Sequence, residues 1–351
     1  MDKYIIMEIW IFGAILISFI LTMYSLPKWI KKCQQVGLLW GDMNKIGGEM
    51  NRAGGNKNVA ASGGVVVVMS FVLGVLFYIA VRTFILDIDG VGISIFALLS
   101  VILILALVGF VDDILGWTYQ GLSIRFRLFL AFAASVPLIV INAGSSIINI
   151  PFLGFMDVGF FYPLVLIPLG IAGATTTYNF LAGFNGLESG LGIIILSFLS
   201  FVAFLTGSSW LSVVGLCMVA SLIVFYFYNK YPAKVFPGDV LTYSIGALIA
   251  IMAILGNFEK IAVFVFMLYI VETGLKVRGG LKKQSFGKVN NDGSLDLPYD
   301  KIYGLTHLSI LILKKFKKKV YETDVIYLIF IFQIIICLLA LIIFREGLFG
   351  W

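Results

Sequence analysis

Long apolar stretches, bounded by charged residues, glycine or proline, follow one another along most of the chain. A bilayer core requires about 20 apolar residues per helix, so each stretch of that size predicts one membrane-spanning helix. The pattern predicts an all-α polytopic membrane protein with about ten transmembrane helices, organised as a single domain over residues 1–351. The predicted spans are residues 5–27, 63–81, 92–111, 128–142, 160–178, 189–206, 211–228, 241–256, 261–275 and 325–344.

Composition supports this interpretation. Hydrophobic residues make up 60% of the chain and charged residues 13%, and the mean hydropathy is +1.04, which excludes a soluble globular protein of this length. The net charge of +6 does not indicate a nucleic-acid partner, because the Lys and Arg residues are concentrated between the predicted spans, as membrane topology requires.

The distribution of these basic residues also predicts an orientation. Of the 25 Lys and Arg residues, all but four lie in connections on one side of the predicted membrane, and by the positive-inside rule that side is cytoplasmic. Both termini are then extracytoplasmic, and every polar motif described below lies at the cytoplasmic end of a span. The basic connections are residues 28–62, 112–127, 229–240 and 276–324.

Two adjacent carboxylates, Asp112 and Asp113, end the third predicted span within the motif FVDDILG. Paired acids so close to hydrocarbon repel one another and are costly unless a cation or a shared proton compensates. A Mg²⁺-dependent role or a general-base role is one interpretation. Two solvated residues capping the end of a span are an equally weighted alternative.

An Asn/Gly-rich segment with one acid, YNFLAGFNGLESG, joins the fifth and sixth spans. Glycine lets the backbone approach a ligand closely, and Asn offers an amide oxygen to a hard cation or donors to a base or phosphate. A tight turn at Asn185-Gly186 would explain Asn185 but not Asn179, so a functional role is favoured.

Asp239 begins the eighth span after a Pro-Gly break in NKYPAKVFPGDV. Asp is a common N-terminal cap of helices, so capping alone would explain it. Its position at the membrane boundary, like that of the two motifs before it, favours a role in a shared site.

The connection 276–324 is the longest and most basic, and connections of this length are usually functional or disordered. We expect irregular or hairpin-like structure there, with a turn at Asn291-Asp292-Gly293. Positive-inside topology explains most lysines on such a loop. The basic residues that could clamp a pyrophosphate are Lys276, Arg278, Lys282, Lys283 and Lys288.

His307 is the only histidine, and its apolar surroundings at residues 305–313 favour a structural role. The groups left for chemistry are Asp, Asn, Lys and Arg, which favours metal-assisted phosphoryl transfer over acyl transfer or zinc hydrolysis. No P-loop or GxSxG motif is present.

Taken in this order, FVDDILG, NFLAGFNGLESG and NKYPAKVFPGD resemble the polyprenyl-phosphate N-acetylhexosamine-1-phosphate transferase family. The resemblance covers nearly the whole chain and is greatest to the archaeal and eukaryotic dolichyl-phosphate GlcNAc-1-phosphate branch. It implies a UDP-GlcNAc:polyprenyl-phosphate GlcNAc-1-phosphate transferase (EC 2.7.8.-) that releases UMP. Such an enzyme would carry out the first membrane step of lipid-linked oligosaccharide synthesis for N-glycosylation or cell-surface glycans.

Carried over by position, the resemblance implies that Asn179 and Asp239 hold Mg²⁺, for which Mn²⁺ could substitute, together with the donor pyrophosphate. Asp112 and Asp113 would line the reaction centre, and Asp112 is the one expected to act on the acceptor phosphate. Arg127 stands where the dolichol branch has Lys, and keeps the positive charge.

The resemblance also implies the donor-binding residues. Asn185 falls where the family contacts uridine, with Gly183 beside it and Glu188 close by. The family's Arg-His-Arg element is not present in the long loop, and the cations that we expect in its place are Lys282, Lys283 and Arg278.

The implied partners are a UDP-sugar donor, a polyprenyl phosphate acceptor, the lipid bilayer and a second copy of the chain in a homodimer. We expect a multi-pass protein of the cell membrane with its active site facing the cytoplasm, or of the endoplasmic reticulum in a eukaryote. The alternative is a multi-pass transporter of a phosphorylated or anionic solute. A transporter is typically built with charges midway along broken helices and with inverted repeats, and the sequence shows neither.

Overall fold

The computed structural model describes residues 3–41, 57–88, 90–118, 121–150 and 154–349. Within these ranges the chain is mostly helical, and seven helices are long and apolar enough to cross a membrane. They confirm a polytopic, mostly helical membrane protein. The seven are α1 (Lys3–Val36), α2 (Gly64–Val81, continued by the π-helical turn η1, Arg82–Leu86), α3 (Gly92–Thr118), α7 (Leu187–Leu205), α8 (Ser209–Asn229), α9 (Gly238–Gly256) and α13 (Glu322–Ile343).

The other three predicted spans correspond to pairs of shorter helical segments, and none is among the seven long apolar helices. The pairs are α4 (Ile124–Ala133) with α5 (Val136–Val140), the π-helical turn η2 (Tyr162–Leu166) with α6 (Ile167–Tyr178), and α10 (Glu259–Val265) with α11 (Met267–Arg278). Two of the pairs contain a break, at residues 134–135 and at residue 266, whereas η2 continues directly into α6.

A buried glutamine compensates the break between α10 and α11. Gln333 of α13 is fully buried, and its Nε2 donates a hydrogen bond of 2.9 Å to the carbonyl oxygen of Val265, the last residue of α10. An unsatisfied carbonyl in apolar surroundings costs several kcal/mol, about the value of the bond it lacks. The polar residue in an otherwise apolar helix is therefore part of the helix packing.

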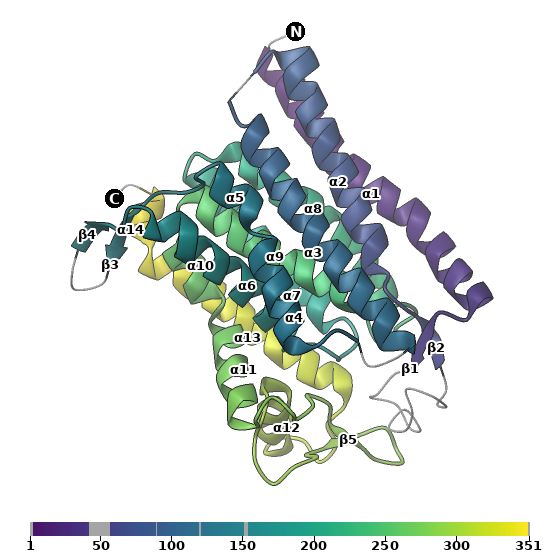
Figure 1. Ribbon diagram of the computed structural model, residues 1–351. Helices are drawn as coiled ribbons and strands as arrows, with labels where there is room; N and C mark the ends of the chain where they lie inside the picture. The colour runs from purple at the N-terminus through teal and green to yellow at the C-terminus, as the bar shows by residue number, and fades with distance from the viewer. Residues whose placement is uncertain (1–2, 42–56, 89, 119–120, 151–153, 350–351) are drawn as a thin grey trace.

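The remaining elements lie at the two ends of the helices. Figure 1 shows β1, β2, β5 and α12 toward the lower side of the view, whereas β3, β4, α14 and the C-terminus lie at its left and the N-terminus at its top. The turn predicted at Asn291–Gly293 is confirmed, because it joins β5 to β6. The bounds are β1 (Leu39–Gly41), β2 (Lys57–Ala60), β3 (Ile147–Ile150), β4 (Gly154–Asp157), β5 (Lys288–Val289), β6 (Leu295–Asp296), α12 (Leu305–Lys314) and α14 (Arg345–Phe349).

Helix α9 is the most deeply packed of the seven long helices and contacts α2, α3, α6 and α7. Small residues permit the closest of these contacts. A Cβ atom added at Gly109 of α3 would lie 2.6 Å from the carbonyl oxygen of Asp239 and the nitrogen of Val240. One added at Gly246 would lie 2.6 Å from the carbonyl oxygen of Ala174 in α6. Helix α9 is therefore held closely against α3 at its N-terminus and against α6 near its middle.

Candidate active site

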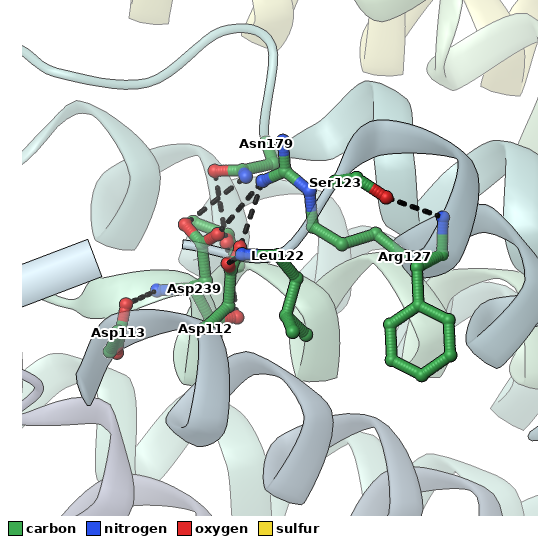
Figure 2. Close-up of polar contacts among 9 residues, drawn as sticks. Asp112, Asp113, Leu122, Ser123, Arg127, Asn179 and Asp239 are labelled. Carbon is green, nitrogen blue, oxygen red and sulfur yellow. Dashed lines mark hydrogen bonds and ion pairs between the residues drawn. The ribbon is translucent and has the colours of Figure 1, made fainter. Parts of the chain in front are cut away.

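Four polar side chains from four different helices meet where those helices end. Asp112 belongs to the last turns of α3, Arg127 to the first turns of α4, Asn179 directly follows α6, and Asp239 lies in the first turn of α9. Figure 2 shows them pointing toward one another. We refer to Asp112, Arg127, Asn179 and Asp239 as the acidic cluster.

Asp112 is held from two directions. Its Oδ1 accepts a hydrogen bond of 2.5 Å from the backbone nitrogen of Leu122, and its Oδ2 accepts one of 2.9 Å from Nη1 of Arg127. The side chain of Ser123 accepts from the nitrogen of Phe126 and so caps the start of α4. The cap fixes the helix that carries Arg127, and the 6% exposed Asp112 carboxylate has a permanent cation beside it.

Asp239 is the more open carboxylate, with 25% of its side chain exposed. Its Oδ1 accepts a hydrogen bond of 3.1 Å from Nδ2 of Asn179, and its Oδ2 lies 3.5 Å from Nη1 of Arg127. The Thr242 hydroxyl, one turn further along α9, donates to Oδ1 of Asn179 at 3.2 Å. Arg127 thus bridges the two carboxylates of the cluster.

Asp113, although adjacent to Asp112 in sequence, has a different environment. Its Oδ1 accepts from the backbone nitrogen of Asp239 at 2.8 Å, and its Oδ2 accepts from the hydroxyl of Ser62 at 2.8 Å. The carboxylate caps the N-terminus of α9, where backbone N–H groups lack helical partners and negative charge is favourable. The side chain is buried, so its contacts are those of a group that positions α9.

The segment that carries Ser62 is itself fixed to the segment before α9. The nitrogen of Phe236 donates to the carbonyl oxygen of Ala60 at 2.8 Å, and the nitrogen of Gly63 donates to the carbonyl oxygen of Phe236 at 2.9 Å. These backbone bonds tie the start of α2 to the Pro-Gly entry of α9. Hydrogen bonds therefore join three segments that are far apart in sequence: residues 60–63, the end of α3 at Asp113, and residues 236–239.

The Asn/Gly-rich segment forms a loop beside the cluster, between Asn179 and the start of α7. Within it, the predicted donor-binding residues are largely enclosed: Asn185 is 2% exposed and Glu188 is 4% exposed. Glu188 Oε1 accepts a hydrogen bond of 2.7 Å from the backbone nitrogen of Gly183. Glu188 therefore contacts the loop backbone in this structure.

The predicted cations of the long loop lie at the surface or against aromatic rings. Arg278 and Lys282 are exposed. The Nζ atom of Lys283 lies 4.6 Å from the centroid of the Tyr299 ring and 5.8 Å from that of Tyr303, which is cation–π geometry. A role for these three residues in donor binding stays a prediction.

His307 has the contacts of a structural residue. Its Nε2 lies 3.2 Å from the carbonyl oxygen of Phe286, and the backbone nitrogen of Tyr303 donates to its Nδ1 at 3.4 Å. Both ring nitrogens are satisfied when the ring is neutral and Nε2 carries the proton. Burial also lowers the pKa of His307.

The donor atoms of the acidic cluster suit a hard cation. The described residues hold no group of three or more His, Cys, Asp or Glu side chains arranged for a metal. Mg²⁺, however, is usually held by one or two carboxylates together with substrate phosphates and water. Asp112 and Asp239 provide carboxylates of this kind, and the amide oxygen of Asn179, which accepts one bond from Thr242, has a second lone pair for a cation.

Several contributors to the site were not predicted from the sequence. Ser62, Thr242 and the backbone of Leu122 support the cluster through the bonds given above, and Glu322 of α13 contacts the Asn/Gly-rich loop. A serine or threonine in a loop or helix carries no pattern of its own. Glu322, in contrast, is an acid at the beginning of an apolar span, as Asp239 is, and this pattern could have indicated a site residue.

The fold and site define a class: a polytopic membrane protein whose acidic, amide and cationic side chains converge at the ends of its spans. Residues 95–257 match the model of Glycosyl transferase family 4. A Sulfolobus acidocaldarius protein is 30% identical over 332 residues, which cover 94% of each chain. One from Saccharolobus solfataricus is 40% identical over 226 residues, 64% of this chain and 67% of the relative.

Both archaeal relatives carry the name UDP-N-acetylglucosamine–dolichyl-phosphate N-acetylglucosaminephosphotransferase as a provisional assignment. The Dictyostelium discoideum enzyme with this name is 33% identical over 204 residues, 49% of this chain and 48% of the relative. The chain belongs to glycosyl transferase family 4.

Proposed function

We propose that this protein transfers N-acetylglucosamine 1-phosphate from UDP-GlcNAc to a polyprenyl phosphate of the dolichyl type, with release of UMP. The observation that carries the proposal is the convergence of Asp112, Arg127, Asn179 and Asp239 at the ends of four apolar helices. The names of the three relatives above support this choice of donor and acceptor.

The location of the cluster suits a lipid acceptor. A polyprenyl phosphate keeps its chain in the hydrocarbon and its phosphate among the head groups, which is the depth of a span end. An oxygen of that phosphate attacks the sugar-bearing phosphorus of the donor, the bond from this phosphorus to UMP breaks, and UMP leaves with the bonding electrons. Both reactants are anionic, and two unit charges at 4 Å repel by about 4 kcal/mol at an effective dielectric of 20.

Residues of the acidic cluster offset part of the repulsion between the two anionic substrates. Arg127 lies between Asp112 and Asp239, where its guanidinium can turn toward incoming phosphate oxygens. Asp112 keeps Arg127 in place and, at the membrane boundary, is the carboxylate that orients or deprotonates the acceptor phosphate. Asp113 holds the N-terminus of α9, and therefore the Asp239 backbone, at a fixed position.

Asp239 and Asn179 are the residues that would hold a divalent cation, Mg²⁺ with Mn²⁺ as a substitute, and Asp112 supplies a further carboxylate nearby. Such an ion neutralises the negative charge on the transferring phosphoryl group. Thr242 contributes indirectly, because its hydrogen bond fixes the Asn179 amide.

The remaining features of the proposal concern the whole protein. We place the acidic cluster at the cytoplasmic face of a cell membrane, with ten crossings and both termini outside, because the basic connections gather on the same side as the cluster. The product would begin a lipid-linked oligosaccharide, and a homodimer is the proposed assembly. Asn185 and Gly183 would contact uridine, and Arg278, Lys282 and Lys283 would approach the donor from the long loop.

The test is release of UMP from UDP-GlcNAc by the purified protein with dolichyl phosphate and Mg²⁺. We expect release to require the lipid and to stop with EDTA, and Asp239→Ala to abolish it while leaving the protein folded. Asp300→Asn, which removes an exposed acid of the long loop, is the matched control and should retain activity. UMP release that persists in Asp239→Ala, or that needs no acceptor, would contradict the proposal.

A further inference from the structure

The loop between α6 and α7 is held by two buried carboxylates that come from different parts of the chain. Glu188, in the first turn of α7, accepts a hydrogen bond of 2.7 Å from the nitrogen of Gly183. Glu322, in the first turn of α13, accepts one of 2.6 Å from the nitrogen of Asn185. Both acids are 4% exposed.

These two hydrogen bonds fix the backbone of a loop whose glycines have an unusual conformation. Gly183 has a φ of +111° and Gly186 a φ of +86°, conformations that glycine adopts and other residues avoid. A charged acceptor makes a stronger hydrogen bond to a backbone N–H than a neutral one does. The backbone N–H groups of Gly183 and Asn185 therefore both donate to carboxylates, one from α7 and one from α13.

Glu322 itself is firmly placed. It begins α13, where negative charge is favourable at the helix N-terminus, and Asp324 caps the same turn through the backbone nitrogen of Tyr321. Helix α13 packs against α7, and a Cβ atom added at Gly190 would lie 2.1 Å from the Phe330 ring. Helix α13 is thus packed closely against α7, which begins directly after the loop.

The long loop contacts the same segment from a third side. A Cβ atom added at Gly183 would lie 2.6 Å from the ring of Phe286, and the hydroxyl of Ser285 donates to the carbonyl oxygen of Phe180 at 3.3 Å. The hydroxyl of Thr306 in α12 donates in turn to the carbonyl oxygen of Ser285 at 2.6 Å. Residues 285–286 of the long loop, to which α12 is bonded through Thr306, therefore pack against one side of the Asn/Gly-rich loop.

We infer that Glu322 is a positioning residue for the nucleotide end of the donor: with Glu188, it holds residues 183–185 in the shape that receives uridine. This inference rests on the proposed function. It assigns a role to an acid outside the three motifs and changes the expectation for Glu188 from substrate contact to support of the loop backbone.

The test compares Glu322→Ala, Glu322→Gln, Glu188→Ala and Glu188→Gln with the wild-type protein. Two readouts are needed: binding of UMP by the purified protein, and the separate KM values for UDP-GlcNAc and dolichyl phosphate. Each alanine variant should weaken UMP binding and raise the KM for UDP-GlcNAc by about tenfold, as expected for loss of one charge-assisted hydrogen bond. The KM for the lipid and kcat should change little.

The glutamine variants keep an oxygen acceptor, so they should recover most of the nucleotide affinity and guard against loss by misfolding. Asp324→Asn is the matched control in the same turn of α13, because it removes the charge that pairs with Lys317 but keeps a side-chain oxygen that can accept from the nitrogen of Tyr321 and so preserves the cap. It should leave the KM for UDP-GlcNAc unchanged.

Unaltered UMP affinity in Glu322→Ala, or an equal loss in Asp324→Asn, would overturn the inference. A lower Tm with unchanged nucleotide affinity would do the same, since it would show a purely structural acid. If the wild-type protein binds UMP and transfers no sugar phosphate, only the proposed function fails. If it binds no uridine nucleotide, both fail.

Discussion

Asp112 and Asp113 show how two identical neighbours acquire different roles through their surroundings. Asp112 is paired with Arg127 and faces the other members of the acidic cluster. Asp113 accepts bonds from Ser62 and from the first turn of α9. Consecutive residues of a helix point in directions about 100° apart, so only one of them can face the reaction while the other caps a neighbouring helix.

The Asn variants of the two aspartates should therefore separate catalysis from stability. Asp112→Asn should lower kcat about 100-fold or more, as loss of a charged group at a reaction centre typically does, with a Tm near that of the wild type. Asp113→Asn should cost about 1–3 kcal/mol of stability and lower the Tm in detergent. Equal effects of both variants on kcat and Tm would refute this division.

His307 makes a second prediction at the residue scale. Its folded pKa lies below the ordinary value of 6.5, so the unfolded chain binds a proton more readily as the pH falls. The contribution of the neutral ring is complete above the unfolded pKa and is lost as the pH falls from there through the folded pKa. The Tm should therefore fall between about pH 7.5 and about pH 5.5, and His307→Gln should flatten that slope. An unchanged slope in the variant would assign the pH dependence to other groups.

Among the elements, the contact between α3 and α9 decides whether the acidic cluster forms. Asp112 lies on α3 and Asp239 on α9, and the two helices meet where Gly109 leaves no side chain between them. The whole cluster depends on backbones approaching closely at the end of a span. Small residues are the usual means of such an approach between membrane helices.

Gly109→Ala should therefore impair the enzyme without touching a polar group. The added methyl group would collide with the backbone at Asp239 and Val240, and overpacking of this kind costs about 1–3 kcal/mol. We expect both a lower Tm and a loss of UMP release. Gly116→Ala in the same helix is the control, since no atom of the part of the chain that the structure describes lies within 4 Å of its added Cβ. Equal activity in the two variants would show that α3 and α9 can separate freely.

The sequence predicts the positions of the helices better than the breaks within them. Hydropathy locates each apolar stretch, and all ten predicted segments correspond to helical structure in the fold. The break at Phe266 was not visible, because it depends on Gln333, which is distant in sequence and satisfies the carbonyl oxygen of Val265. Likewise, the motifs indicate that Asp112, Asn179 and Asp239 belong to one site. The hydrogen bonds from Ser62 to Asp113 and from Asn185 to Glu322 join residues distant in sequence, and no sequence pattern reveals them.

For the whole molecule, the arrangement of basic connections predicts which side faces the cytoplasm. The three cysteines are buried, so a new surface cysteine can be labelled selectively. Glu346→Cys should react with a membrane-impermeant maleimide in intact cells, and Asp300→Cys should react only after the membrane is opened. Both positions are exposed. The reverse pattern would place the acidic cluster on the outer face and exclude cytoplasmic UDP-GlcNAc as its donor.

A site at the membrane boundary that receives a lipid phosphate and a UDP-sugar is expected to transfer the sugar together with its phosphate. The most direct measurement supplies the purified protein with dolichyl phosphate, Mg²⁺ and UDP-GlcNAc labelled with ³²P in the phosphate next to the sugar. We expect the label to move into the lipid phase and unlabelled UMP to remain in water. Labelled UDP in the aqueous phase beside an unlabelled glycolipid would show transfer of the sugar alone and contradict sugar-phosphate transfer, as would the absence of any lipid product.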